Sequence, residues 1–223
     1  MEDLVTKKYI LEKYSDSVLN NKGELKNVYS FCKEHDISEK DFYQYFANFE
    51  EVEKEYLVYF FEESLGLIIS DENYFDLHGK EKLLSLYYTY FEQLTLNRSL
   101  VLYILKRSKN PLKQMAQLSK LKSEFLKFLH SLNLEAFEMS DMEKNSENIS
   151  KIKKKGLEEI FWGNFAATIK FWIEDTSASF EKTDIFIEKS VAASLELTEA
   201  QPFKKLLDLG KFMWKEQMNK YKA

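Results

Sequence analysis

The sequence predicts an all-α protein in which a small N-terminal domain precedes a larger helical domain. The 223 residues include only 6 glycines and 2 prolines, so residues that interrupt helices are scarce. Apolar residues recur along most of the chain with the period of amphipathic helices. A chain of this length can fill one small and one larger core. We expect a three-helix domain over residues 1–50 and a second helical domain over residues 51–223.

The N-terminal domain has the caps, turn and spacing of a helix-turn-helix. A first helix is predicted over residues 4–20 and a second after Gly23, and Asp36 and Ile37 form the turn that follows. Ser38 is the expected N-cap of a third helix ending near residue 46, and Asp41 can complete a capping box. The third helix takes the place of a recognition helix. The apolar positions that let three helices share one core are Val28, Phe31, Cys32, Ile37, Phe42, Phe46 and Val52.

A long fourth helix is predicted from its N-cap, Asn48, to about residue 69. It is long enough to leave the small domain and enter the larger one, so we expect the two domains to share it in place of a flexible linker. Its inward stripe is predicted to contain Val52, Tyr56, Tyr59, Phe60 and Leu67.

The remaining helices are predicted from apolar periodicity and from the breaks in it. Pro111 suits the first turn of its helix, in which Met115 is expected to face inward. Residues 135–149 are polar and acidic, so they are predicted to form a mobile loop. The expected helices cover about residues 80–95, 98–108, 111–132, 152–174, 179–195 and a last stretch after Pro202.

The charge of the chain argues against a strongly electrostatic contact with nucleic acid. The formal net charge is −5, and residues 1–50 hold seven lysines and ten acidic residues, a local charge of −3. Counterion release from DNA favours a neutral or basic surface. Residues 98–130 compensate in part, because they hold eight Lys or Arg residues against the single acid Glu124. This basic region is either a solvated helix face or a contact for an anionic group.

The residue pattern predicts no catalytic or metal chemistry. His35, His78 and His130 are scattered, and neither a glycine-rich phosphate loop nor a nucleophile elbow is present. We therefore expect a protein that is not an enzyme and needs no cofactor. The sequence lacks eighteen consecutive apolar residues, and its acidic start lacks the apolar core of a secretory signal. These features favour the cytoplasm, where Cys32 is expected to be a buried, reduced thiol.

The N-terminal stretch resembles the DNA-binding domain of the tetracycline-repressor (TetR) family of bacterial regulators. The resemblance rests on Val28, Phe31–Cys32, Asp36–Ser38, Phe42–Phe46, Asn48 and Glu50–Val52. It implies a DNA-reading domain, a helical ligand-binding and dimerisation domain behind it, and a homodimer that binds double-stranded DNA. The DNA-facing residues that it implies are Lys26, Asn27, Glu39, Lys40, Tyr43, Gln44 and Tyr45.

Three positions depart from the usual residues of that family. Family members often carry Arg where Tyr29 stands, a small residue where Asp41 stands and Lys where Phe49 stands. Two cations are therefore missing and one anion is added, so contacts to phosphates should be fewer. The amino-acid sequence does not identify the operator sequence or the effector, and it does not distinguish a repressor from an activator.

A second resemblance concerns the ligand domain. Residues 167–190 are similar to the C-terminal domain of the ubiquinone-biosynthesis accessory protein family, a lipid-binding branch of the same fold, through Asp175, Ser177, Phe180, Thr183 and Phe186. The similarity implies a domain able to enclose a long apolar molecule, whereas the residues alone favour a plain turn between two helices. Aromatic residues that would surround such a pocket also fit an ordinary core; they are Tyr87, Tyr90, Phe91, Tyr103, Phe125, Phe161, Phe165 and Trp172.

Two functions remain open. The first is a TetR-like, ligand-responsive transcriptional regulator. The alternative is a TetR-fold protein that binds a lipid or another apolar ligand, with little or no DNA binding. In both cases the resemblance implies a homodimer through the helices near residues 152–174 and 179–195, where Ala166–Ala167 and Ala192–Ala193 permit close helix approach.

Overall fold

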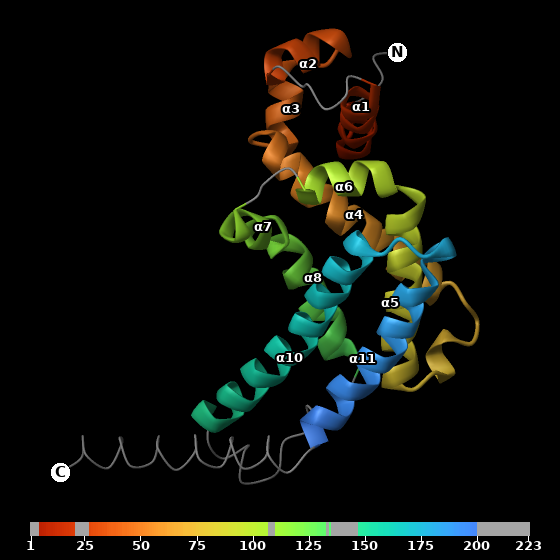
Figure 1. Ribbon diagram of the computed structural model, residues 1–223. Coiled ribbons are helices and arrows are strands. Elements are labelled where there is room, and N and C mark those ends of the chain that lie inside the picture. Colours follow the sequence, from red (N-terminus) through yellow and green to blue (C-terminus); the bar gives the residue numbers. More distant parts are fainter. Residues whose placement is uncertain (1–4, 21–26, 107–109, 133, 135–146, 200–223) are drawn as a thin grey trace, which may run out of the picture. The chain divides into compact units, whose positions relative to one another are not determined.

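The computed structural model describes residues 5–20, 27–106, 110–132, 134 and 147–199. Over these ranges the chain forms helices and no strand, which confirms the all-α prediction (Figure 1). The chain divides into two compact units: unit 1 is Met1–Asp71 with Thr89–Glu124, and unit 2 is Glu72–Tyr88 with Phe125–Ala223. A compact unit need not coincide with a functional domain, so the predicted division into residues 1–50 and 51–223 stays a prediction.

Unit 1 begins with the three helices predicted at the N-terminus: α1 is Lys7–Asn20, α2 is Val28–Glu34 and α3 is Glu39–Tyr45 (Figure 1). Their shared core is aromatic. Phe31 packs edge-on against Phe42 with 6.0 Å between ring centroids, and Phe42 also lies 6.0 Å from Phe46. All three rings are almost fully buried. The predicted apolar spacing therefore closes one small core beneath α2 and α3.

The caps in this domain lie where the sequence places them. The Ser38 side chain accepts from the backbone N–H of Asp41 at 3.0 Å, and Asn48 accepts from Glu51 at 3.0 Å. The turn between α2 and α3 is closed by a bond from the Ile37 N–H to the Cys32 carbonyl at 2.9 Å. Asp36 reaches this turn with a φ of 54°, a left-handed conformation that Asp tolerates better than most residues.

The rest of unit 1 comes from α4 (Phe49–Ile69), the end of α5 (Gly79–Leu96), α6 (Arg98–Lys106), α7 (Pro111–Gln117) and the start of α8 (Ser119–Ser131). The prediction of one helix over residues 111–132 is wrong, because the chain breaks at Leu118. The Leu118 N–H bonds to the Met115 carbonyl at 3.2 Å, a tight turn that ends α7. The Leu118 carbonyl then accepts from Lys122 at 2.8 Å to start α8.

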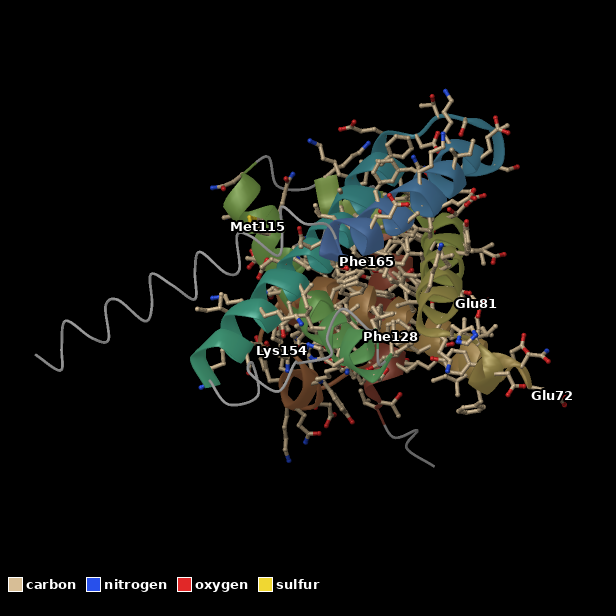
Figure 2. The ribbon with its side chains drawn as sticks, turned by 90° about the horizontal axis from the view of Figure 1, so that it is seen from below. Glu72, Glu81, Met115, Phe128, Lys154 and Phe165 are labelled. Atoms are coloured by element: carbon tan, nitrogen blue, oxygen red, sulfur yellow. The ribbon has the colours of Figure 1, made fainter. Side chains whose placement is uncertain are left out.

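Two side chains expected to face inward are exposed. Met115 is 70% exposed on α7, where Figure 2 labels it. Leu67, near the end of α4, is 53% exposed. Helical periodicity identifies the side of a helix on which a residue lies. It does not show whether another helix covers that side, so periodicity alone misplaced Met115 and Leu67.

Unit 2 contains the start of α5, the end of α8 and the pair α10 (Glu147–Glu174) and α11 (Glu181–Glu199), which lie side by side (Figure 1). Two short 3₁₀ turns, η1 (Tyr74–Asp76) and η3 (Ala178–Phe180), also lie in the described part of unit 2. The helix predicted from residue 152 begins at Glu147, so residues 147–149 of the predicted loop are helical. The rest of that loop and the helix expected after Pro202 lie outside the described residues. No helix within the described ranges is long and apolar enough to cross a membrane.

Candidate nucleic-acid interface and ligand domain

The face of α3 that points away from the aromatic core is polar and exposed. Phe42 is fully buried, whereas Glu39, Lys40, Tyr43 and Gln44 are all exposed. Residues spaced by one, four and five positions lie on one side of a helix, so these four side chains form a single surface. We call this set the α3 face. It is held in place by the Ser38 cap on one side and by the buried Phe42 on the other.

The other predicted DNA-facing residues occupy the edges of the α3 face. Tyr45 is 41% exposed, and its hydroxyl donates to the Val5 carbonyl at 3.3 Å. Asn27 is exposed and caps α2, because its side-chain oxygen accepts from the Ser30 N–H at 2.8 Å. Lys26 lies outside the described residues. DNA contact by the seven DNA-facing residues therefore stays a prediction.

The three positions that depart from the family pattern have different surroundings. Phe49 packs against Tyr14, Phe31 and Phe42, with ring centroids 5.5, 5.6 and 5.9 Å away. Asp41 accepts a hydrogen bond from the Ser38 hydroxyl at 2.5 Å. Tyr29 is 59% exposed. Phe49 and Asp41 thus support the fold of the helix-turn-helix, whereas Tyr29 faces solvent.

Some cations near the helix-turn-helix are already engaged. Lys7 of α1 pairs with Glu55, and Lys120 lies 2.9 Å from Glu51 and 3.3 Å from Glu55. Lys54 lies 2.6 Å from Glu51, and the hydrogen bonds from Lys54 and Lys120 lower the pKa of Glu51. Part of the basic region at residues 98–130 is therefore neutralised within unit 1. The α3 face itself carries one lysine, the exposed Lys40.

The cysteine of the helix-turn-helix is buried, as predicted. Cys32 is 2% exposed, and burial raises the pKa of its thiol, with a further contribution from the nearby Glu39 carboxylate. A thiol with a raised pKa is a poor nucleophile. Among the described residues, no group of three His, Cys, Asp or Glu side chains is placed to hold a metal ion.

The predicted pocket residues are divided between the two units. Tyr90, Phe91 and Tyr103 belong to unit 1, where Tyr90 is fully buried, lies 5.8 Å from Phe61 by ring centroid and donates to the Leu57 carbonyl at 3.4 Å. Burial strongly raises the pKa of the Tyr90 hydroxyl. The structure packs this ring within a core, and whether such a core opens for a ligand stays a prediction.

In unit 2 three of the other predicted pocket residues, Tyr87, Phe125 and Phe165, form one aromatic cluster. Phe125 stacks on Phe165 with 4.5 Å between centroids, and Tyr87 meets Phe165 edge-on at 5.0 Å. Figure 2 labels Phe165 on α10. The Tyr87 hydroxyl donates to the Asn164 side chain at 2.7 Å, and burial raises its pKa. Phe161 and Trp172 are also buried.

A shallow groove of about 430 Å³ on α10 and α11 was not foreseen from the sequence. The Phe171 and Phe186 rings stack at its floor with 4.5 Å between centroids, and Ile185 is 49% exposed beside them. Lys182, Lys189 and Ser190 complete the lining. The groove joins two helices, so the apolar pattern of either helix alone could not reveal it.

The corner between α10 and α11 is organised by Asp175. One carboxylate oxygen accepts from the N–H and hydroxyl of Ser177 at 2.8 and 2.7 Å. The other oxygen accepts from the N–H and hydroxyl of Thr183 at 3.0 and 2.7 Å. Burial by itself raises the pKa of this carboxyl, but the four hydrogen bonds outweigh it and lower the pKa to about 2. The polar residues expected to form an interhelical turn therefore do so.

The geometry defines a helical protein with three N-terminal helices, α1 to α3, and an antiparallel pair of late helices, α10 and α11. Residues 82–213 match a family model described as "Tetracyclin repressor-like, C-terminal domain". The chain belongs to this tetracycline-repressor-like family. A search of curated proteins finds no match. The matched residues begin after α4, so the family model does not cover α1 to α3, and their role as a DNA-binding helix-turn-helix stays a prediction.

Proposed function

We propose that this protein is a transcriptional regulator that binds double-stranded DNA as a homodimer in the cytoplasm and responds to a ligand. The observation that supports the proposal best is the exposed α3 face, presented by a capped helix-turn-helix ahead of a domain of the tetracycline-repressor-like family. In helix-turn-helix domains the recognition helix, whose place α3 takes in this chain, enters the major groove with its exposed face.

The residues of the α3 face suit contacts with a DNA groove. Gln44 can bind adenine with two hydrogen bonds, and Glu39 can accept from the amino group of cytosine. Lys40 and the Tyr43 hydroxyl can bind phosphates, and the Tyr43 ring can also contact a thymine methyl. Lys26, Asn27 and Tyr45 would add contacts at the edges. With few cations, the affinity should depend strongly on these uncharged contacts.

A homodimer would bring two α3 faces to two half-sites. We propose that α10 and α11 form its interface, because the groove at Phe171, Ile185 and Phe186 leaves apolar surface exposed on the single chain. Substituting Ile185→Glu should then convert a dimer into a monomer in size-exclusion chromatography with light scattering. Ile152→Glu, at a similarly exposed position of α10, is the matched control. A monomeric native protein would contradict the dimer.

The ligand response is proposed to start in the aromatic cluster of Tyr87, Phe125 and Phe165 in unit 2. An apolar molecule inserted among these rings would favour one of two dimer geometries and so change the spacing of the two helix-turn-helix domains. Native mass spectrometry of the purified protein, followed by extraction and identification of bound small molecules, tests this step.

DNA binding is tested by titrating fluorescent duplexes with the full chain at several salt concentrations. The upstream DNA of its own gene should bind more tightly than a scrambled duplex, and affinity should fall as salt rises. Gln44→Ala should reduce this preference by about 1–3 kcal/mol if Gln44 reads a base. Met115→Gln, at an exposed site away from α3, is the control. Equal, weak binding of every duplex would refute the regulator.

The second candidate is a protein of the same fold that binds a lipid or another apolar ligand and binds DNA weakly or not at all. The local charge of −3 over residues 1–50 favours it, as does the engagement of Lys7 and Lys120 by α4 carboxylates. The similarity of residues 167–190 to the ubiquinone-biosynthesis accessory protein family supports a lipid as ligand. Repeated absence of any bound lipid or apolar molecule in the extracts would contradict this candidate.

A further inference from the structure

Helix α4 carries a carboxylate that is both buried and shared between two other helices of unit 1. Glu53 is 1% exposed. One of its oxygens accepts from the Tyr14 hydroxyl of α1 at 2.7 Å, and the other accepts from the Gln117 side-chain amide at 3.1 Å. Helix α4 also packs against both α1 and α7 (Figure 1). A single charged group thus receives donors from two helices that are far apart in sequence.

Gln117 stands at the end of α7, next to the break at Leu118. Its amide nitrogen donates to Glu53 and also to the Ile104 carbonyl of α6 at 2.8 Å. The side chain of Gln117 therefore joins α4, α6 and α7 at one point. Because α7 ends there, a shift of α7 or α8 changes the position of this amide directly.

The partner on the other side, Tyr14, belongs to the helix-turn-helix domain. It is fully buried, and its ring lies 5.5 Å from Phe49, which in turn contacts Phe31 and Phe42. A displacement of Tyr14 is therefore transmitted to the aromatic core that supports α2 and α3.

We propose that Tyr14, Glu53 and Gln117 form a latch through which the α7–α8 junction sets the position of α1. Glu53 and Gln117 act as positioning residues for the α3 face, and neither touches DNA. The proposal names how the DNA-reading face is regulated, so its consequence for DNA rests on the proposed function, whereas the coupling between α7 and α1 does not.

The physical basis of the latch is the cost of leaving a buried carboxylate without its donors. A buried carboxyl group that loses a hydrogen bond is destabilised, so Glu53 must adjust when Gln117 withdraws. The Tyr14 hydroxyl of α1 bonds to the other oxygen of Glu53, so the adjustment acts on α1. The ion pairs of Lys120 with Glu51 and Glu55 lie nearby but are partly exposed, with the Lys120 side chain 38% exposed. Solvent can replace those contacts, so they should carry less of the coupling.

Amide hydrogen exchange of the full chain, read by mass spectrometry, tests the latch. Gln117→Met keeps the length of the side chain and removes its donor. It should speed exchange in α1 peptides about tenfold, although residue 117 is not in α1. Gln117→Asn, which keeps an amide but is one methylene shorter, should do the same. Met115→Gln on the same helix and Lys120→Met should leave α1 exchange within about twofold.

Tyr14→Phe supplies the decisive comparison, because it removes only the hydroxyl that bonds to Glu53. In the Tyr14→Phe background, adding Gln117→Met should not speed α1 exchange further. Additive effects of the two substitutions, an unchanged α1 in both Gln117 variants, or a larger effect from Lys120→Met would each overturn the latch.

The DNA titration separates this inference from the proposed function. If the native protein binds its DNA, Gln117→Met should weaken binding about tenfold without changing the preferred sequence, since the α3 face is intact. If the native protein binds no DNA, the regulator fails while the exchange experiment still decides the latch. Sequence-specific binding that Gln117→Met leaves unchanged would show that the latch does not position the α3 face.

Discussion

Asp175 and Asp36 show how single residues shape the connections between helices. Asp175 satisfies four donors at the α10–α11 corner, two from Ser177 and two from Thr183. Asp36 occupies a left-handed turn position between α2 and α3. The first residue is stabilised by its environment, and the second adopts a conformation that an L-residue finds costly.

The Asp175 corner makes a pH-dependent contribution to stability. The pKa of the Asp175 carboxyl in the folded state is about 2, below the ordinary value of 3.8, so folding stabilises its ionised form. The contribution is present above about pH 4 and is lost as pH falls towards 2, and its size is about 2 kcal/mol. Asp175→Asn should lose about this amount at pH 7, and the difference between the two proteins should shrink below pH 4. Urea unfolding across this pH range measures both; a constant difference would contradict the assignment.

Replacing Asp36 by glycine should stabilise the protein. With φ at 54°, Asp36 is strained relative to Gly, which reaches this region freely. The relief, about 1–2 kcal/mol, exceeds the added entropy of an unfolded glycine, about 0.5–1 kcal/mol, so the net gain is about 0.5–1 kcal/mol. Asp36→Ala, which keeps a Cβ, is the control and should be neutral or destabilising. A less stable Gly variant in urea unfolding would show that the Asp36 side chain is needed.

Helices α2, α3 and α4 were predictable because their boundaries depend on local bonds. Each N-cap in this domain bonds to an N–H three residues away, as Ser38 does to Asp41. The break between α7 and α8 depends on long-range contacts, since Gln117 bonds to Glu53 and Lys120 pairs with Glu55. A sequence pattern contains no signal for partners more than sixty residues away in the chain, so one continuous helix was expected.

The cap of α4 can be tested as an element. Asn48→Ala removes the acceptor for the Glu51 N–H and should cost about 1 kcal/mol in the free energy of unfolding. Asn48→Asp keeps an acceptor at the same place and should retain most of the stability. Thermal unfolding followed by circular dichroism compares the three proteins. Equal losses in both variants would show that the amide nitrogen of Asn48 matters more than its oxygen.

The fold class follows from composition and periodicity, but the placement of the candidate site residues does not. The family resemblance placed Glu39, Lys40, Tyr43 and Gln44 on the exposed side of α3, where the structure has them exposed and Phe42 buried; their contact with DNA stays a prediction. Helical spacing could not show that Phe49 closes an aromatic core, because that role depends on rings from α1, α2 and α3. The departures from the family pattern looked like losses of DNA contacts, and only the packing separates Phe49 from the exposed Tyr29.

The charge of the whole chain gives a last prediction about DNA affinity. With a net charge of −5, the protein gains little from counterion release, so one added cation should have a visible effect. Tyr29 is 59% exposed and stands where the family often carries Arg, so Tyr29→Arg should tighten DNA binding and steepen the slope of log affinity against log salt by about 0.9 for each chain of the proposed homodimer. Phe49→Lys adds the same charge within the aromatic core, so it should lower the melting temperature without strengthening binding. Tyr29→Gln is the uncharged control. If Tyr29→Arg leaves both affinity and slope unchanged, position 29 lies away from the phosphates, and the α3 face alone must account for any binding.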